Sequence, residues 1–336
     1  MTPPKPARWF DPRLLLGLAI SVFALWWSFR AIDLRALAAV LAGADLRVAL
    51  PASVACYLGS LWIRVLRWRH LAAALGPLPY GVAYRATAIR FMGNNVFPFR
   101  LGELAGAWFA ARDAGGSAAA WFGTIVLERA FDMAAIMSLA VFLLADQIAL
   151  PPAARALAFV PVLGVAGLRV WPAALLGAAR SVARALLPGR LAASLLGLME
   201  NVAAGLAGIR DLRGLALVLA HTVALWGVAA TLPFYLAQRA LGVALGSFGA
   251  DYLAALKTMV GVGIAVALPQ APGFLGTYHL ASSSVLTALG VPETTALAIG
   301  TLAHAIFWIS ITGFGLIALR GSRASFTDAV RGVTER

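Results

Sequence analysis

The chain has 336 residues, of which 61% are hydrophobic and only 12% charged, and its mean hydropathy is +0.86. Soluble domains carry roughly 25% charged residues, so the composition excludes an ordinary soluble protein and predicts an all-α polytopic membrane protein. The net charge of +13 is spread along the chain and not gathered in a polar domain, which argues against nucleic-acid binding. A single cysteine and four scattered histidines exclude an intramolecular disulfide and offer no metal-ligand spacing.

Apolar windows in chain order predict about six full spans, since about 20 apolar residues cross a hydrocarbon core of roughly 30 Å. The first window follows a basic arm but ends in LWWSFR, which has no small-residue cleavage site, so it predicts a retained span. Alternating crossings with both termini in the cytoplasm put most loop arginines on that side. This topology counts Arg64 and Arg67 as loop charges. The predicted spans are 14–29, 48–66, 118–145, 155–177, 214–237 and 294–319.

Two further hydrophobic regions, 82–112 and 252–290, are each interrupted by proline and glycine. The interruptions are GNNVFPFRLGE, residues 93–103, and LPQAPGFLG, residues 268–276. Proline stops a helix, and irregular backbone at membrane depth is tolerated only where protein buries it or it lines a cavity. We therefore expect two opposed re-entrant hairpins, or discontinuous helices, in an inverted-repeat transporter. A simple kink or surface loop at each break is the alternative.

The segment 178–213 is Arg-bearing, too polar to span, and has leucine and alanine at helical spacing. It predicts a helix at the cytoplasmic interface that links a first half, 14–177, to a second half, 214–319, within one transmembrane domain.

The first interruption gathers charged and amide side chains inside an apolar run. Glu103 would fall in the first turn of the returning helix, where a carboxylate is favoured, so helix capping is its alternative role. A guanidinium inside the membrane is costly and is usually paired or part of a substrate path. We therefore predict that this cluster faces an anionic lipid headgroup, with ion pairs from Arg90 and Arg100 to Glu103 and Glu128 as the alternative. Its members are Arg90, Asn94, Asn95, Arg100 and Glu103.

LERAFD, residues 127–132, adds Glu128, Arg129 and Asp132 to a predicted span. Glu128 and Asp132 are one turn apart and share a helix face. At membrane depth they would support or couple transport, whereas at a helix end they would be a solvated cluster.

The second interruption carries fewer polar groups. Gly273 permits close backbone approach, free amides there could bind phosphate, and His279 could titrate near neutral pH. We predict substrate contacts from Gln270, Gly273, Tyr278 and His279, with Lys257 as a coupling charge.

Two other kinds of protein remain open. A membrane-embedded lipid-modifying enzyme would use Glu103, Glu128 and Asp132 as acids or bases, although no P-loop, nucleophile elbow or HExxH motif occurs. An accessory subunit of a lipid-synthesis complex would explain the hydrophobicity but not the paired breaks.

The two interruptions resemble the N-x-x-P-x-R-x-G-E and P-x-x-P-G-x-x-G motifs of the lysylphosphatidylglycerol synthase transmembrane, or flippase-like, family. The resemblance implies a lipid transporter in a bacterial cytoplasmic membrane, with a lipid as substrate and no cofactor. A homo-oligomer is compatible with it. Many members have a glutamate where this chain has His279, which resembles the hopanoid-associated branch. No aminoacyl-transferring domain follows the last span, so we expect no synthase activity. The matching positions are Asn95, Pro98, Arg100, Gly102 and Glu103, then Pro269, Pro272, Gly273 and Gly276.

Overall fold

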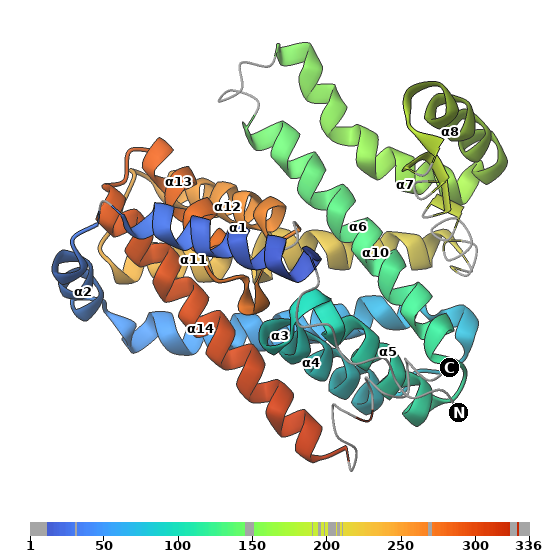
Figure 1. Cartoon of the computed structure of the whole chain (residues 1–336), viewed down its shortest axis with the longest axis horizontal. Helices are drawn as coiled ribbons and strands as arrows, with labels where there is room; N and C mark the ends of the chain where they lie inside the picture. Colours follow the sequence, from blue (N-terminus) through green and yellow to red (C-terminus); the bar gives the residue numbers. More distant parts are fainter. Residues whose placement is uncertain are drawn as a thin grey trace.

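The protein is a helical bundle in which four helices are long and apolar enough to cross a bilayer (Figure 1). The computed structural model describes residues 12–30, 32–144, 151–189, 191–193, 196–197, 199–200, 206, 209, 211–267, 271–322 and 328. Every regular element in this part of the chain is a helix, as the composition predicts. The four candidate spans are α3 (Leu46–Leu71), the α10–α11 segment (Leu212–Ala240), α12 (Phe248–Ala265) and α14 (Glu293–Arg320). The α10–α11 segment consists of α10 (Leu212–Ala224), a short turn and α11 (Leu232–Ala240).

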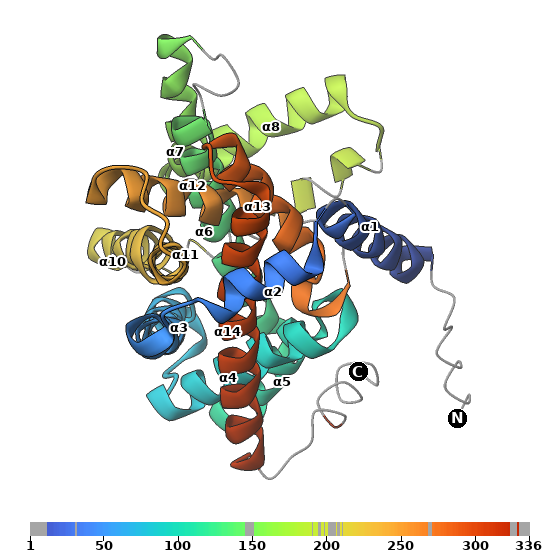
Figure 2. The same ribbon diagram turned by 90° about the vertical axis from the view of Figure 1, so that its left-hand side faces the viewer.

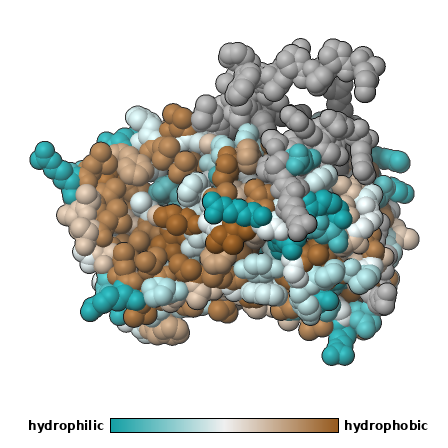
Figure 3. Space-filling model, turned by 90° about the horizontal axis from the view of Figure 1, so that it is seen from below, coloured by the Kyte–Doolittle hydropathy of each residue, from teal (hydrophilic) through white to brown (hydrophobic). Residues whose placement is uncertain are grey.

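The surface agrees with a membrane environment. Figure 3 shows a broad apolar area on the face seen from below, over its left half. The exposed apolar side chains include Trp26, Val48, Ile309 and Ile317. The protein is therefore a multi-pass membrane protein.

The other long helix is α6 (Ala118–Leu144), which carries three charged residues in its middle. Its 27 residues extend about 40 Å, enough for the hydrocarbon core. The elements outside the long helices and the two broken segments are α1 (Pro12–Phe29), α2 (Leu34–Ala42), η1 (Ala73–Leu75), η3 (Pro152–Phe159), α7 (Val160–Val170) and α8 (Pro172–Leu186).

The region predicted as one span, 155–177, differs from the structure. It holds a 3₁₀ segment, then α7 of 11 residues, and a new helix that starts at Pro172. Proline disfavours a helical conformation in the preceding residue, and α7 alone reaches only about 16 Å. The predicted linker, 178–213, begins inside α8, and much of its remainder lies outside the described residues.

Both predicted helix breaks are present, and each begins with a proline. In the first, α4 (Tyr80–Val96) is followed by the 3₁₀ turn η2 (Pro98–Arg100) and then α5 (Leu101–Ala114). In the second, α12 is followed by the turn η5 (Pro272–Phe274) and α13 (Thr277–Ala288). The backbone turns through the left-handed region at Arg100 (φ 54°) and at Gly273 (φ 68°), so the chain reverses locally instead of continuing the helix.

Small residues let the two arms of the first hairpin approach closely. Two of these small residues stand in GELAG, residues 102–106 of α5. A β-carbon on Gly102 would meet the carbonyl oxygen of Arg90, and one on Gly106 would lie 2.9 Å from the Arg90 Cβ. Glycines four residues apart on a membrane helix commonly allow such backbone contact. In the second hairpin, a β-carbon on Gly261 would lie 2.7 Å from a methyl carbon of Val285.

One face of α14 runs along both hairpins, with α13 against one part of it and α4 against another (Figure 2). Gly300 and Gly315, which make the outermost of these contacts, are about 22 Å apart along the helix. Between them, α14 touches both breaks. In order along α14, the contacts are Gly300 with Ser282, His304 with Gly273, Asn95 with Thr312, and Gly315 with Met92.

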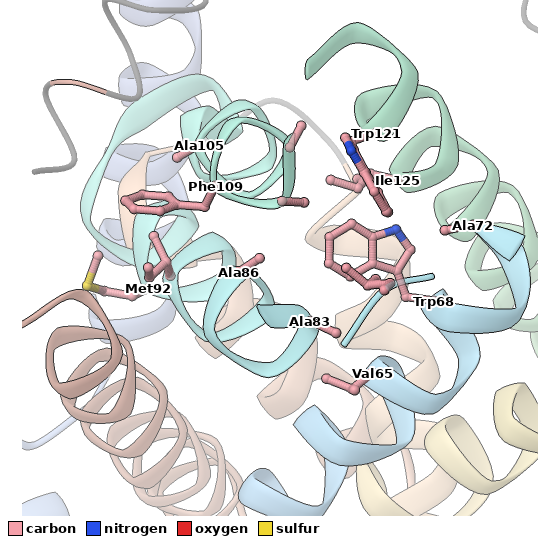
Figure 4. Packing of buried hydrophobic residues seen from close by; sticks show 14 residues of the cluster. Val65, Trp68, Ala72, Ala83, Ala86, Met92, Ala105, Phe109, Trp121 and Ile125 are labelled. Atoms are coloured by element: carbon pink, nitrogen blue, oxygen red, sulfur yellow. The ribbon is translucent and has the colours of Figure 1, made fainter. Parts of the chain in front are cut away.

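The first hairpin is fixed against α3 and α6 by an apolar core (Figure 4). Trp68 of α3 and Trp121 of α6 meet edge to face, with ring centroids 5.8 Å apart, and the indole N–H of Trp68 donates to the Thr124 hydroxyl at 2.8 Å. Phe109 of α5 and Met92 of α4 belong to the same cluster. This packing holds four helices in register at the level of the charged residues.

Candidate functional site

Seven charged side chains from four helices form a buried ion-pair network between α3, α4, α5 and α6. Charges in a membrane interior are costly unless they are paired, and these are paired. Arg67, Arg90 and Glu128 are fully buried, and Asp132 is 1% exposed. The members of the network are Arg64, Arg67, Arg90, Glu103, Glu128, Arg129 and Asp132.

Glu128 is the centre of this network. Its Oε1 lies 2.9 Å from Nη2 of Arg67 and 3.6 Å from Nη1 of Arg64, and its Oε2 lies 2.8 Å from Nη1 of Arg90. Glu128 stands in the middle of α6 with no exposed surface. The cluster is therefore not a solvated helix end.

Asp132 lies one turn further along α6 and connects the network to a neighbouring helix. Arg67 approaches it at 2.8 Å, Arg129 at 3.3 Å and Arg64 at 3.4 Å. The indole N–H of Trp226 also donates to Asp132 Oδ1, at 2.9 Å.

Glu103 occupies the first turn of α5, as predicted. Its carboxylate accepts a hydrogen bond from Asn94 Nδ2 at 3.1 Å and lies 3.6 Å from Nε of both Arg90 and Arg129. The first turn of a helix favours a carboxylate electrostatically, and at this residue the same carboxylate also forms ion pairs.

The loop assignment of Arg64 and Arg67 is wrong. The helix α3 continues to Leu71, and both guanidinium groups are buried in the network. One signal was available in the sequence, because two arginines three apart can face two carboxylates four apart on a second helix.

A cavity of about 160 Å³ lies beside the network and between the two breaks. Three arginine side chains reach it, those of Arg64, Arg100 and Arg129, together with the Asn94 amide. Among the described residues that line it, none carries a carboxylate. The rest of the wall is aromatic or aliphatic and includes Tyr57, Phe91, Trp226, Phe234, Tyr278 and Phe307.

Arg100 differs from the four arginines of the network because it takes part in no ion pair among the described residues. Its Nη2 donates instead to the backbone carbonyl of Val266, beside the second break, at 2.5 Å. The predicted pairing of Arg100 with Glu103 is therefore absent here, whereas Arg90 does pair with both Glu103 and Glu128.

The group as a whole carries more positive than negative charge. The five arginines are Arg64, Arg67, Arg90, Arg100 and Arg129, and they face three carboxylates, Glu103, Glu128 and Asp132, so positive charges exceed negative ones by two. In addition, Nε and Nη2 of Arg129 are buried without a hydrogen-bond partner among the described residues.

The second break contributes neutral groups. His304 lies 2.7 Å from the Gly273 carbonyl through Nε2 and stacks on Tyr278 with ring centroids 4.4 Å apart. Tyr278 also lines the cavity. His279 is buried between Phe29 and His304 and does not line the cavity.

Three other residues predicted to contact or support the substrate do not line the cavity or lie outside the described residues. The Asn95 amide turns to Thr312, at 3.2 Å. Lys257 is half-buried on α12, does not line the cavity, and has no ion pair within the described part of the chain. Gln270 lies outside the described residues. Within those residues, no group of three or more His, Cys, Asp or Glu side chains is arranged to hold a metal ion.

These features define a multi-pass helical membrane protein whose two broken segments meet beside a buried charge network. The chain belongs to the family described as the lysylphosphatidylglycerol synthase TM region, whose model matches residues 14–315. That match covers both breaks and the whole network, so the family suggested by the two motifs is confirmed. Comparison with curated proteins gives no match, and neither does comparison with solved structures.

Proposed function

We propose that this protein moves an anionic lipid between the leaflets of a bacterial cytoplasmic membrane, with the lipid headgroup bound in the arginine-lined cavity. One observation carries the proposal: Arg64, Arg100 and Arg129 reach a cavity with no carboxylate among its described lining residues, at the place where two broken helices meet. Family membership supports a function connected with membrane lipids.

The charge balance favours an anionic headgroup over an uncharged polyisoprenoid or hopanoid. An anion in the cavity would offset the surplus of positive charge, which is costly inside a membrane. Guanidinium groups bind phosphate and carboxylate oxygens through paired hydrogen bonds. The Arg100 guanidinium lines the cavity, pairs with no carboxylate among the described residues and supplies such donors, while Arg64 and Arg129 add positive charge to the same wall.

The arrangement of the breaks favours transport over static binding. In our proposal the two segments are re-entrant hairpins that enter from opposite sides and meet at their tips, as inverted-repeat transporters arrange their sites. Two contacts support this: a β-carbon on Gly273 would lie 3.0 Å from the Asn95 carbonyl, and Arg100 bonds Val266 across the same boundary. The hairpin bodies rest on parts of α14 about 22 Å apart.

The enzyme alternative would need a carboxylate presented to the substrate. Glu103, Glu128 and Asp132 are each held by two or more arginines, and none of them lines the cavity. Carboxylates held in this way are not presented to a substrate in the cavity, so the geometry favours transport. An accessory role would leave the paired breaks without a purpose.

Leaflet exchange in proteoliposomes tests the proposal. Fluorescent phosphatidylglycerol would be added symmetrically, and the fraction of probe bleached by a membrane-impermeant reductant would be followed over time. We expect the wild-type protein to exchange phosphatidylglycerol faster than protein-free vesicles and faster than it exchanges phosphatidylcholine.

The decisive variant is Arg100→Gln, because it unpairs no carboxylate among the described residues and should fold. We expect it to slow exchange about tenfold, equivalent to about 1.4 kcal/mol. The matched control is Arg47→Gln, an arginine whose side chain is 89% exposed, and it should exchange at the wild-type rate. Equal rates for Arg100→Gln and wild type, with both folded, would contradict the site.

A further inference from the structure

A second, larger cavity of about 380 Å³ lies beside the charge network, between α6, α7 and α10. Its lining is mainly aliphatic and aromatic and includes Phe131, Ala135, Leu139, Val165, Leu219 and Val223. The hydroxyl of Thr222, which also lines it, already bonds the Val218 carbonyl and the Arg67 guanidinium. The Ser138 hydroxyl also lines the cavity and is buried without a hydrogen-bond partner among the described residues. Apart from this one hydroxyl, the cavity offers a hydrocarbon surface.

The wall between the two cavities is a π-helical turn, η4 (Leu225–Ala229), in the middle of the α10–α11 segment. Trp226 lines both cavities, with Leu225 and Ala229 on the arginine side and Gly227 on the apolar side. Turns of this kind interrupt helices frequently at functional sites.

Side chains hold this turn in place. The Trp226 carbonyl accepts a hydrogen bond from the Thr231 hydroxyl at 2.7 Å, and the Gly227 carbonyl accepts one from Tyr252 at 2.5 Å. The Trp226 indole donates to Asp132, which also binds Arg64 and Arg129 of the arginine cavity. One residue thus separates a cationic space from an apolar space and is bonded to the charge network.

We infer that the apolar cavity binds one hydrocarbon chain of the lipid whose anionic headgroup occupies the arginine cavity, with the chain passing Trp226. This inference rests on the proposed function. Charge complementarity identifies the headgroup, and the two cavities adjoin at Trp226, which lines both. Bilayer tails are as apolar as the cavity, so moving an acyl chain from the bilayer into the cavity gains little free energy. Occupancy of the cavity by the chain therefore depends on binding of the headgroup.

That dependence can be tested with the full-length protein in vesicles that contain phosphatidylglycerol bearing a diazirine on one acyl chain. After irradiation, labelled residues would be located by peptide mass spectrometry. We expect labels in residues 131–139 of α6 and 219–227 of the α10–α11 segment. Arg100→Gln should reduce them at least fivefold, and phosphatidylcholine with the same acyl chain should label these residues at least fivefold less.

A pair of variants on α6 tests the cavity itself. Ala135→Phe fills it and should remove most of the label, whereas Met137→Phe, at a position 47% exposed and outside the cavity lining, should leave the label unchanged. Circular dichroism and gel filtration would confirm that both variants fold.

The outcomes separate this inference from the proposed function. Labelling that is equal for both headgroups and insensitive to Arg100→Gln would mean an ordinary lipid-filled crevice and would overturn the inference. Labels absent from these residues, while the protein still exchanges phosphatidylglycerol, would overturn the inference and leave transport standing. Headgroup-dependent labels in a protein that exchanges no lipid would support the chain site and overturn transport.

Discussion

The two broken segments share a backbone design but differ in chemistry. Each consists of a helix, a 3₁₀ turn that begins with proline, and a second helix, and each break contacts the same face of α14. The first stands in a network of buried charges, whereas the second is surrounded by Tyr278, His279 and His304. Helix breaks thus set the place where a site can form, and the neighbouring helices decide its charge.

The difference also assigns unequal roles within the proposed site. The first hairpin supplies the cation Arg100, and the second supplies the Val266 carbonyl that holds it and the Tyr278 ring that lines the cavity. Substitutions should therefore affect the charged side through electrostatics and the neutral side through packing and single hydrogen bonds.

The largest effect should come from the charged side, with Glu128→Gln. This change leaves Arg64, Arg67 and Arg90 without their shared carboxylate, and breaking a buried pair typically costs about 3–5 kcal/mol. Thermal unfolding in detergent should show a large loss of stability, while His279→Gln at the neutral side should show a much smaller one. A Glu128→Gln protein as stable as wild type would contradict the claim that buried ion pairs stabilise the first break more than the neutral contacts stabilise the second.

Gly102→Ala should come next, because the new methyl group would meet the Arg90 carbonyl between α4 and α5. Overpacking of this kind costs about 1–3 kcal/mol, measurable by chemical unfolding. Gly123→Ala, in α6 with nothing within 4 Å of the new β-carbon, is the control and should be neutral. Gly276→Ala should cost a similar amount in the second segment, because Gly276 has φ 86° and lies against α1. Equal losses of stability in Gly102→Ala and Gly276→Ala would show that the two broken segments are equally tightly packed.

A smaller effect is expected from His304→Phe. This change keeps a ring beside Tyr278 but removes the hydrogen-bond partner of the Gly273 carbonyl, and a neutral hydrogen bond contributes about 0.5–1.5 kcal/mol net. Thermal unfolding should show a modest loss, and Thr301→Ala, a position on the same helix whose hydroxyl bonds only its own turn, should show less. If His304→Phe destabilised the protein as much as Glu128→Gln, the claim that only single uncharged contacts hold the second break would be wrong.

The smallest effect belongs to an ion pair outside the spans. The Arg47 guanidinium and backbone N–H donate to the carboxylate and lower the pKa of Asp45 to about 2. Its stabilising contribution is therefore present above about pH 4 and is lost as the pH falls towards 2. Because solvent screens exposed pairs, Asp45→Asn should leave the melting temperature at pH 7 almost unchanged. A shift as large as that of Glu128→Gln would mean that burial does not distinguish the two ion pairs.

Local chemistry made the helix breaks predictable. Pro98 and Pro272 mark the turns, and Glu103 occupies the first turn of α5 because a carboxylate is favoured there. The break before Pro172 follows from the same rule, yet hydropathy alone suggested one continuous span. The apolar windows, the breaks and the family motif are all properties of short stretches.

The charge network could not be predicted from short stretches. Arg64 and Arg67 were assigned to a loop because hydropathy windows and the distribution of loop charges do not record partners about 60 residues away, and their partners on α6 come together only in the fold. The arginine cavity depends on α3, α6, α11, α12, α14 and both breaks at once. The π-helical turn at Trp226 also has no signal in the local sequence.

The most direct test of the central claim is the lipid that stays bound to the purified protein. Native mass spectrometry of the wild-type protein, extracted gently from its membrane, should show an anionic lipid enriched over its share of the membrane. Arg100→Gln should reduce this enrichment at least tenfold, because a hydrogen bond to a charged group contributes about 1.5–3 kcal/mol and about 1.4 kcal/mol corresponds to a factor of ten. Arg47→Gln should keep the enrichment. Retention of only zwitterionic or uncharged lipid, or equal retention of the anionic lipid by Arg100→Gln, would contradict the claim that these arginines bind an anionic headgroup.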